Sequence, residues 1–197
     1  MYRIKRAVKV IILLSLMGIV LFATLTMSCG SAGETSVKLD RFNNDNRPVC
    51  GIEELHITGA APELNIADYR LVVEGAVVTP LALTYEDILA YPTVTEVVLL
   101  VCPGYFTDNA EWTGVPVTTL LNEAGVKTEA TKVIFHAIGT EYRVELPLNV
   151  VRQDGVFLAH TVNRQILPEE HGYPLRLVVK GNYGYDWIKW LDRIEII

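Results

Sequence analysis

The sequence contains few cysteines, and its cysteines and histidines lack the spacings that are typical of metal sites. Its three cysteines, Cys29, Cys50 and Cys102, form no Cys-x-x-Cys pair and no Cys-x-x-Cys-His haem-attachment motif, and no two of its four histidines are four residues apart. Iron–sulfur clusters, covalently attached haem and conventional zinc sites need such sets and are not indicated. The glycine-containing segments also lack the spacing of P-loops and of dinucleotide-binding turns.

Basic residues are scarce outside the amino terminus. Four of the 17 Lys and Arg residues lie within residues 1–28, so residues 29–197 carry 13 basic against 23 acidic side chains, a net charge of −10. An acidic domain without a basic run is poorly suited to hold a phosphate backbone. Nucleic acid is therefore not an expected partner.

Residues 1–28 resemble an export signal. Four basic residues precede an apolar run from Val10 to Leu25, which is shorter than the ~20 residues of a comfortable membrane span. Small residues surround Cys29, as in a bacterial lipoprotein signal cleaved before a lipidated cysteine, although Thr26 stands where leucine is usual. We predict lipidation of Cys29, with an uncleaved anchor as the alternative. Both the lipid and the anchor would tether the protein to the outer face of a membrane in the cell envelope, so we expect a periplasmic or other extracytoplasmic location.

The rest of the chain predicts one α+β domain behind a tether. Residues 29–65 are polar and aperiodic, which is typical of a tether that becomes an ordered arm. Residues 66–197 contain about seven strand-like segments and two or three short helical ones in no regular βαβ order, which predicts a single mixed-sheet domain. Thr84 and Asp87 form a helix-start signal, and Gly125 marks the end of a second helix over "VPVTTLLNEAG".

Cys102 ends the apolar, strand-like run "TEVVLLVC", just before a Pro-Gly turn. A strand end fixes the position of a side chain while the loop leaves room for a ligand, so Cys102 is a candidate nucleophile or metal ligand. Two other interpretations stay open: a small buried hydrophobe, or one half of a disulfide with Cys50. Further along, Arg176 and Lys189 lie among Gly-rich turns, where they either receive an anion or cover apolar neighbours with their stems.

Three separated segments carry a family resemblance: "VCPGYFTDNAEWTGVPVTTLLNEAG", "YRVELPL" and "LPEEHGYPLRLVVKGNYGYDWIKWLDRIEI". They include a Cys-x9-Trp-x-Gly-x-Pro spacing and a closing Tyr-Gly-Tyr … Lys-Trp-Leu run. With these motifs, residues 69–197 resemble the molybdopterin-binding oxidoreductase domain of the sulfite oxidase family, in particular its short bacterial branch, which includes the catalytic subunit of periplasmic methionine sulfoxide reductase. The resemblance implies the fold of that domain and a molybdenum–molybdopterin cofactor.

The resemblance also implies functions for five residues. Cys102 corresponds to the single protein ligand of molybdenum, which suits a soft thiolate held at a strand end. Arg176, His171 and Lys189, together with the backbone near Trp187, correspond to the residues that bind the anionic pterin. The chemistry itself would belong to the cofactor.

The chain departs from the family pattern in several places. Asp186 stands where Lys or Arg usually follows Tyr-Gly-Tyr, and "HTVNR" replaces the common "YEMNG". "CPGYFTDN" lacks the Arg that animal and plant sulfite oxidases place after the cysteine, which disfavours sulfite as the substrate. A twin-arginine signal, usual for enzymes that are exported folded with this cofactor, is represented only by Lys5-Arg6.

Two functions are compatible with these residues. The first is an exported, membrane-tethered enzyme that transfers an oxygen atom to or from a small substrate such as an S- or N-oxide, and exchanges electrons with a separate haem or quinone-linked partner. The second is a non-catalytic binding module that has kept the fold and lost the metal cofactor. Cys102, Arg176 and Lys189 favour the enzyme, whereas Asp186 and the missing twin arginine favour the module.

Overall fold

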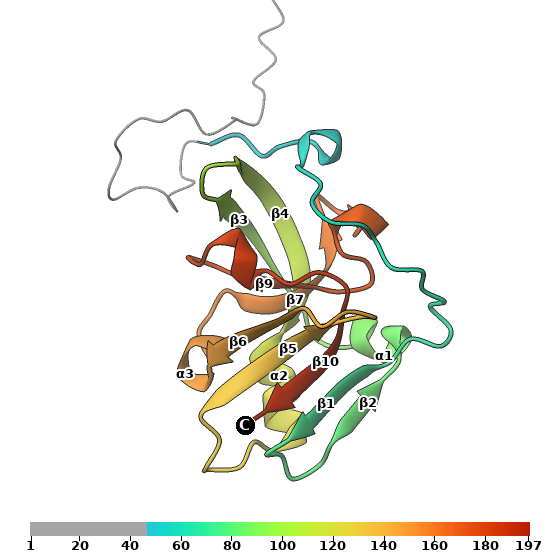
Figure 1. Cartoon of the computed structure of the whole chain (residues 1–197), viewed down its shortest axis with the longest axis vertical. Coiled ribbons are helices and arrows are strands. Elements are labelled where there is room, and N and C mark those ends of the chain that lie inside the picture. The colour runs from blue at the N-terminus through green and yellow to red at the C-terminus, as the bar shows by residue number, and fades with distance from the viewer. Residues whose placement is uncertain (1–46) are drawn as a thin grey trace, which may run out of the picture.

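The computed structural model describes residues 47–197, which form two five-stranded sheets connected by short helices (Figure 1). The first sheet has the order β2-β1-β10-β5-β6, with bounds β1 Leu71–Gly75, β2 Leu81–Leu83, β5 Lys132–Ala137, β6 Arg143–Pro147 and β10 Leu191–Ile196. The second has the order β3-β4-β7-β8, with β9 also paired to β7, and bounds β3 Val94–Cys102, β4 Phe106–Pro116, β7 Val156–Val162, β8 Gln165–Ile166 and β9 Arg176–Val179. The predictions for residues 1–28 and for Cys29 lie outside the described residues.

The first sheet is mixed, because the last strand of the chain lies beside the first. β10 pairs parallel with β1 and antiparallel with β5. The connections follow no regular βαβ order, so the α+β class predicted from the sequence is confirmed.

The helices are short, with bounds α1 Tyr85–Leu89, α2 Val117–Ala124 and α3 Leu148–Val151, and the 3₁₀ turns η1 Ile52–Glu54, η2 Glu169–His171 and η3 Gly184–Asp186. At the start of α1, Thr84 accepts a hydrogen bond from Asp87 N and the Asp87 carboxylate accepts one from Thr84 N, as the start signal predicts. Gly125 ends α2 with φ +68°, a conformation that favours glycine. No helix within residues 47–197 is both long enough and apolar enough to cross a membrane.

The hairpin of β3 and β4 carries Cys102 to one end of the second sheet. Its register runs from the pair Val94–Gly114 to the pair Cys102–Phe106. The second half of β3, residues 98–101, is buried, as the apolar run predicts. The sequence does not predict a strand over β4, because "FTDNAEWTGVP" is polar. Pairing with β3 on one side and β7 on the other holds this segment extended.

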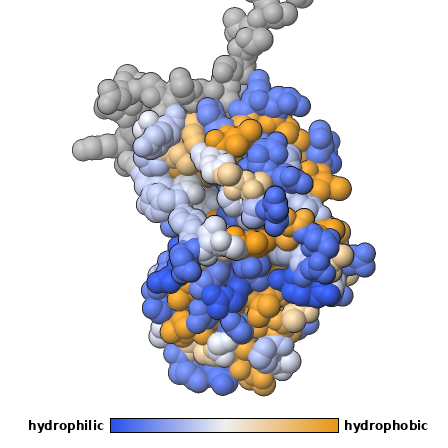
Figure 2. All heavy atoms as spheres, turned by 45° about the vertical axis from the view of Figure 1, so that its right-hand side comes forward, coloured by the Kyte–Doolittle hydropathy of each residue, from blue (hydrophilic) through white to orange (hydrophobic). Residues whose placement is uncertain are grey.

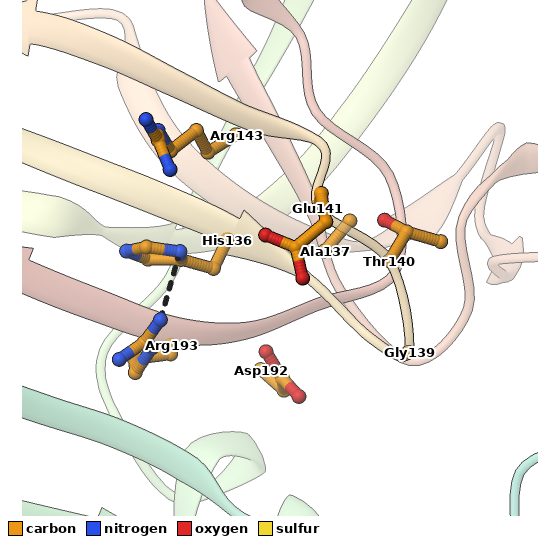
Figure 3. A pocket seen from close by; sticks show the side chains of 8 residues that line it. All are labelled: His136, Ala137, Gly139, Thr140, Glu141, Arg143, Asp192 and Arg193. Carbon is orange, nitrogen blue, oxygen red and sulfur yellow. Dashed lines mark hydrogen bonds between the residues drawn. The ribbon is translucent and has the colours of Figure 1, made fainter.

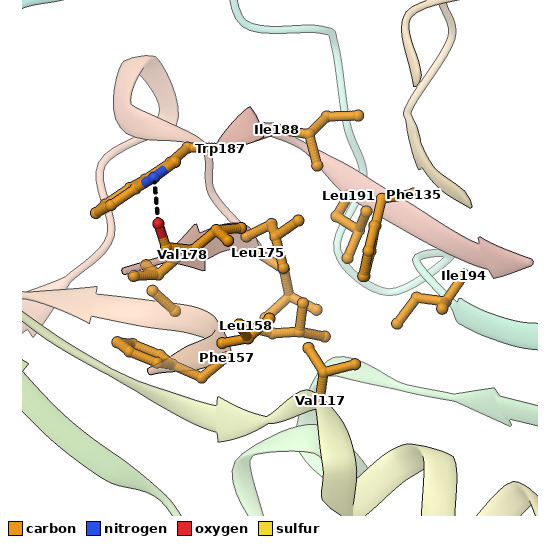
Figure 4. Packing of buried hydrophobic residues seen from close by; sticks show 14 of the residues in the cluster. Val117, Phe135, Phe157, Leu158, Leu175, Val178, Trp187, Ile188, Leu191 and Ile194 are labelled. Atoms are coloured by element: carbon orange, nitrogen blue, oxygen red, sulfur yellow. Dashed lines mark hydrogen bonds between the residues drawn. The ribbon is translucent and has the colours of Figure 1, made fainter. Parts of the chain in front are cut away.

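Apolar side chains from both sheets and from α2 form one core (Figure 4). Val117, Phe135, Phe157, Leu158 and Leu191 come from four elements, α2, β5, β7 and β10, and each is at most 1% exposed. This packing fixes the C-terminal segment, which carries several predicted site residues, against the end of the β3–β4 hairpin.

Residues 47–68 lie along one side of the domain as an arm, on a face that is mainly polar with smaller apolar patches (Figures 1 and 2). Cys50 N donates to Asn109 O at 2.7 Å. The His56 backbone N donates to Asp108 Oδ2 at 2.9 Å, and its ring Nδ1 lies 2.7 Å from Asp108 Oδ1. Since Asp108 is only 1% exposed, the arm reaches a carboxylate buried in the sheet.

Candidate functional site

Cys102 lies where β3 ends and presents a free thiol. The disulfide with Cys50 that the sequence left open is therefore not formed. Opposite Cys102, Tyr183 pairs with Val101 through an isolated parallel bridge, which brings η3 alongside the strand end. A Cβ added at Gly184 would collide with Cys102 Sγ, so this position requires the absence of a side chain.

A cavity of about 300 Å³ opens beside Cys102, and we call it the inner cavity. Its walls come from the arm, the β3–β4 hairpin, the β5–β6 turn and the C-terminal segment, and include Thr58, Cys102, Tyr142, Arg176, Trp187 and Lys189. Four of these six, Cys102, Arg176, Trp187 and Lys189, are residues that the sequence implicates. The other three are 74 or more residues from Cys102 along the chain, so only the fold brings them to it.

Arg176 begins β9 and is a buried cation, 6% exposed. Its Nη1 donates to His171 O at 3.1 Å, but its Nε has no hydrogen-bond partner. The guanidinium carbon lies 5.2 Å from the centre of the Trp112 ring and 5.9 Å from that of Trp187, within range of cation–π attraction. Burial lowers the pKa of Arg176 to about 10, while the nearby Cys102 and Asp108 oppose this effect.

No carboxylate lies within ion-pair distance of Arg176 in residues 47–197. A buried cation is costly unless something compensates its charge. Cys102 does not supply that compensation by itself: burial raises the pKa of its thiol above the ordinary value, and the charge of Arg176 opposes this only in part. The pair is therefore suited to an anionic or electron-rich ligand that contacts both residues.

Lys189 reaches the inner cavity from the C-terminal segment. Its Nζ donates to two backbone carbonyls, Thr58 O on the arm and Glu170 O, the second at 2.8 Å. The ammonium also lies 4.3 Å from the centre of the Trp190 ring. Burial, and after it the charge of Arg176, lowers the pKa of Lys189 to about 8. Lys189 thus connects the arm to the cavity wall.

The other implicated residues have more indirect positions. His171 is 2% exposed and contributes its carbonyl oxygen to Arg176, while its ring lines neither cavity next to Cys102. Burial, together with the charge of Arg176, lowers the pKa of His171. The Trp187 indole N–H donates to Val179 O at 3.0 Å, which orients the ring that lines the cavity. The Asp186 carboxylate accepts a hydrogen bond from Asn182 at 2.8 Å and lines neither cavity, so it does not face the inner cavity.

Sequence reasoning missed several residues of the site, and four of them bear on its geometry. Trp112 and Gly184 pack against Arg176 and Cys102, and Tyr142 lines the cavity from the β5–β6 turn. All three lie within the segments that carry the family resemblance, so a signal was present. Thr58 lies on the arm, where no pattern in the sequence marks it.

A separate pocket of about 430 Å³ lies over β5, β6 and β10 and is lined by charged side chains (Figure 3). Arg193 Nη2 donates to His136 Nδ1 at 3.0 Å, so Nε2 carries the proton of the neutral ring and faces Glu195 at 3.0 Å. Arg193 also pairs with Glu74 at 3.3 Å. These groups satisfy one another, so we assign them no ligand. Within residues 47–197, no three His, Cys, Asp or Glu side chains converge as a metal-binding set.

Comparison with known proteins agrees with the resemblance. A model of the oxidoreductase molybdopterin binding domain matches residues 58–197. The uncharacterized oxidoreductase YuiH of Bacillus subtilis is 34% identical over 140 residues, which covers 70% of each chain. The solved structure of the sulfane dehydrogenase SoxCD from Paracoccus pantotrophus superimposes with a TM-score of 0.65 and 36% identity, over 69% of this chain and 40% of that chain.

Larger relatives contain a similar region within longer chains. Mitochondrial sulfite oxidase of Drosophila melanogaster is 29% identical over 162 residues, 68% of this chain and 28% of that protein. Nitrate reductase [NADH] of Volvox carteri is 28% identical over 170 residues, 70% of this chain and 20% of that protein. The chain thus spans less than a third of either. From the match over residues 58–197 and the relative that is covered over 70% of its length, we conclude that this chain belongs to the oxidoreductase molybdopterin binding domain family.

Proposed function

We propose that this protein is a molybdenum–molybdopterin enzyme that transfers an oxygen atom to or from a small organic substrate, with an S-oxide or N-oxide as the oxidised form. One observation carries the proposal. A buried guanidinium with no carboxylate partner within residues 47–197 and a free thiol line the same cavity.

The residues at the inner cavity fit the cofactor. The Arg176 Nε is a buried donor without a partner, as expected of a group reserved for an acceptor that binds there. Gly184 has no side chain, and the space that a methyl group would occupy there is available to the Cys102 sulfur. A thiolate is a soft ligand that suits molybdenum, and buried cations suit an anionic pterin.

We assign each residue a function on this basis. Cys102 holds the metal, and the end of β3 keeps its sulfur in place. Arg176 and Lys189 bind acceptor atoms of the pterin, while His171 positions Arg176 through its carbonyl oxygen. Trp187 forms the wall against which Arg176 lies. The cofactor, when bound, supplies the two-electron oxygen-atom transfer.

The overall reaction for an S-oxide is R₂SO + 2 H⁺ + 2 e⁻ → R₂S + H₂O, or its reverse. The electrons need a separate carrier, because the sequence contains no haem-attachment motif and no iron–sulfur cysteine set. A haem or quinone-linked partner is the class we propose. The amino-terminal residues support export and a membrane tether, through lipidated Cys29 or an uncleaved anchor, in the cell envelope.

The proposed function is tested by the metal content of the full chain purified from its native host. We expect near-stoichiometric molybdenum in the wild type, loss of the metal in Cys102→Ser, and retention in Cys50→Ser, since Cys50 lies at the contact between the arm and Asn109 rather than at the cavity. Circular dichroism checks that both variants fold. Molybdenum that stays bound to Cys102→Ser would show that the ligand assignment is wrong. Folded wild-type protein without molybdenum would contradict the enzyme.

A further inference from the structure

A second cavity opens outward from Cys102, and we call it the outer chamber. It has a volume of about 490 Å³. It shares Thr58, Cys102, Tyr142 and Gly184 with the inner cavity and adds Pro103, Tyr105 and Tyr185. Any molecule that reaches Cys102 from this side passes these side chains.

The outer chamber is aromatic and carries no formal charge. Tyr105 is 80% exposed, Tyr142 52% and Tyr185 61%. Exposed aromatic side chains that gather around one opening typically mark a binding site. No Asp, Glu, Lys, Arg or His of residues 47–197 lines this chamber, whereas Arg176 and Lys189 line only the inner cavity.

Tyr185 is held in place on its side of the chamber. Its carbonyl oxygen accepts a hydrogen bond from the Tyr142 hydroxyl at 2.9 Å, which connects η3 to the β5–β6 turn. Its ring packs against that of Tyr183 with centroids 5.7 Å apart and a 43° angle between the ring planes. These two contacts hold the backbone and the ring of Tyr185 at the wall of the chamber.

Tyr105 belongs to the turn that follows β3. Tyr105 N donates to Cys102 O at 3.0 Å, and Gly104 has φ +77°. Proline followed by a glycine of positive φ is typical of a type II turn. This turn places the Tyr105 backbone beside the end of β3, so its side chain lines the same chamber as the Cys102 thiol.

We propose that the outer chamber binds an uncharged organic substrate through a planar or apolar substituent that packs on Tyr105 and Tyr185, while the atom that reacts points toward Cys102. The inference rests on the proposed function and specifies its substrate class. Aromatic faces favour planar and apolar groups. An inorganic oxyanion would lose hydration in this chamber and find no cation, because Arg176 and Lys189 bind the pterin.

The test uses the molybdenum-loaded protein and two substrates that share one S–O group, methyl phenyl sulfoxide and dimethyl sulfoxide, with a reduced viologen dye as electron donor. In Tyr105→Ala and Tyr185→Ala, the KM for the phenyl compound is expected to rise about three- to tenfold, the effect of losing one aromatic contact. The kcat values and the KM for dimethyl sulfoxide stay unchanged. Tyr105→Phe keeps the wild-type KM, and Ile166→Ala, an exposed apolar residue outside both cavities, changes nothing.

A binding measurement separates this inference from the proposed function. Saturation-transfer NMR with methyl phenyl sulfone, which has the same ring, reports binding without turnover. Sulfone binding that is weakened about three- to tenfold in each alanine variant supports the outer chamber even if neither sulfoxide is reduced, an outcome that would overturn only the S-oxide chemistry. Unchanged sulfone binding and unchanged KM in both variants overturn the chamber even if both sulfoxides are reduced. Displacement of the sulfone by sulfite or nitrate at equal concentration also overturns it.

Discussion

Replacing Arg176 by methionine is expected to separate cofactor binding from folding. Burial lowers the pKa of Arg176 from its ordinary value to about 10, and a fall of that size corresponds to about 3 kcal/mol against the charged form. At neutral pH the side chain is protonated in the folded and the unfolded chain. The penalty therefore opposes folding in full at pH 7, and it is relieved progressively only as the pH rises above about 10, where the folded chain loses the proton before the unfolded chain does.

Methionine removes this penalty together with two favourable contacts. The hydrogen bond from Arg176 to His171 O is worth about 1.5–3 kcal/mol, and the attraction to the rings of Trp112 and Trp187 about 1–2 kcal/mol. These terms nearly cancel. We expect the cofactor-free variant to unfold in urea within about 2 kcal/mol of the wild type, whereas truncation of an ordinary core side chain costs about 2–5 kcal/mol.

The holoprotein is expected to respond differently. Arg176→Met loses molybdenum, measured by inductively coupled plasma mass spectrometry, because the pterin loses its buried cation. The matched control is Arg193→Met, which removes a half-exposed ion pair with Glu74 and the hydrogen bond to His136, costs about 1–2 kcal/mol and keeps the metal. A cofactor-free Arg176→Met destabilised by more than about 3 kcal/mol would make Arg176 a structural residue and refute the reasoning. Full metal content in that variant would refute its binding function.

Two further substitutions test the geometry around the cavity. Gly184→Ala places a methyl group against Cys102 Sγ, so we expect loss of molybdenum and about 1–3 kcal/mol of destabilisation by calorimetry. In Gly51→Ala the new Cβ meets only the Glu54 side chain at 3.6 Å, so metal content and Tm stay at wild-type values; equal metal loss in both variants would exclude a local steric cause. The two carboxylate oxygens of Asp108 accept from the backbone N–H and the ring Nδ1–H of His56. Asp108→Asn replaces one of these acceptors by an NH₂ donor, so we expect it to lower the free energy of unfolding by about 1–3 kcal/mol. Faster hydrogen exchange at the His56 amide checks this, and unchanged exchange would mean that the carboxylate does not hold the arm.

The sequence alone determined the parts of this protein that depend on neighbours along the chain. The reciprocal hydrogen bonds of Thr84 and Asp87 start α1, and Gly125 ends α2, because capping involves residues within one turn. The apolar run before Cys102 predicted β3 and the position of the thiol at its end. The order of the motifs indicated the family and, through it, Arg176 and Lys189 at the site.

Only the tertiary structure decided which groups meet and in what state. Nothing local makes "FTDNAEWTGVP" a strand, and β4 exists because β3 and β7 pair with it on both sides. The unpartnered Nε of Arg176 and the tyrosines that surround the outer chamber depend on contacts between segments far apart in the chain. Burial, charge compensation and cavity shape are sums over such contacts. A single sequence specifies them only through the fold, so composition and spacing could identify the residues but not their environment.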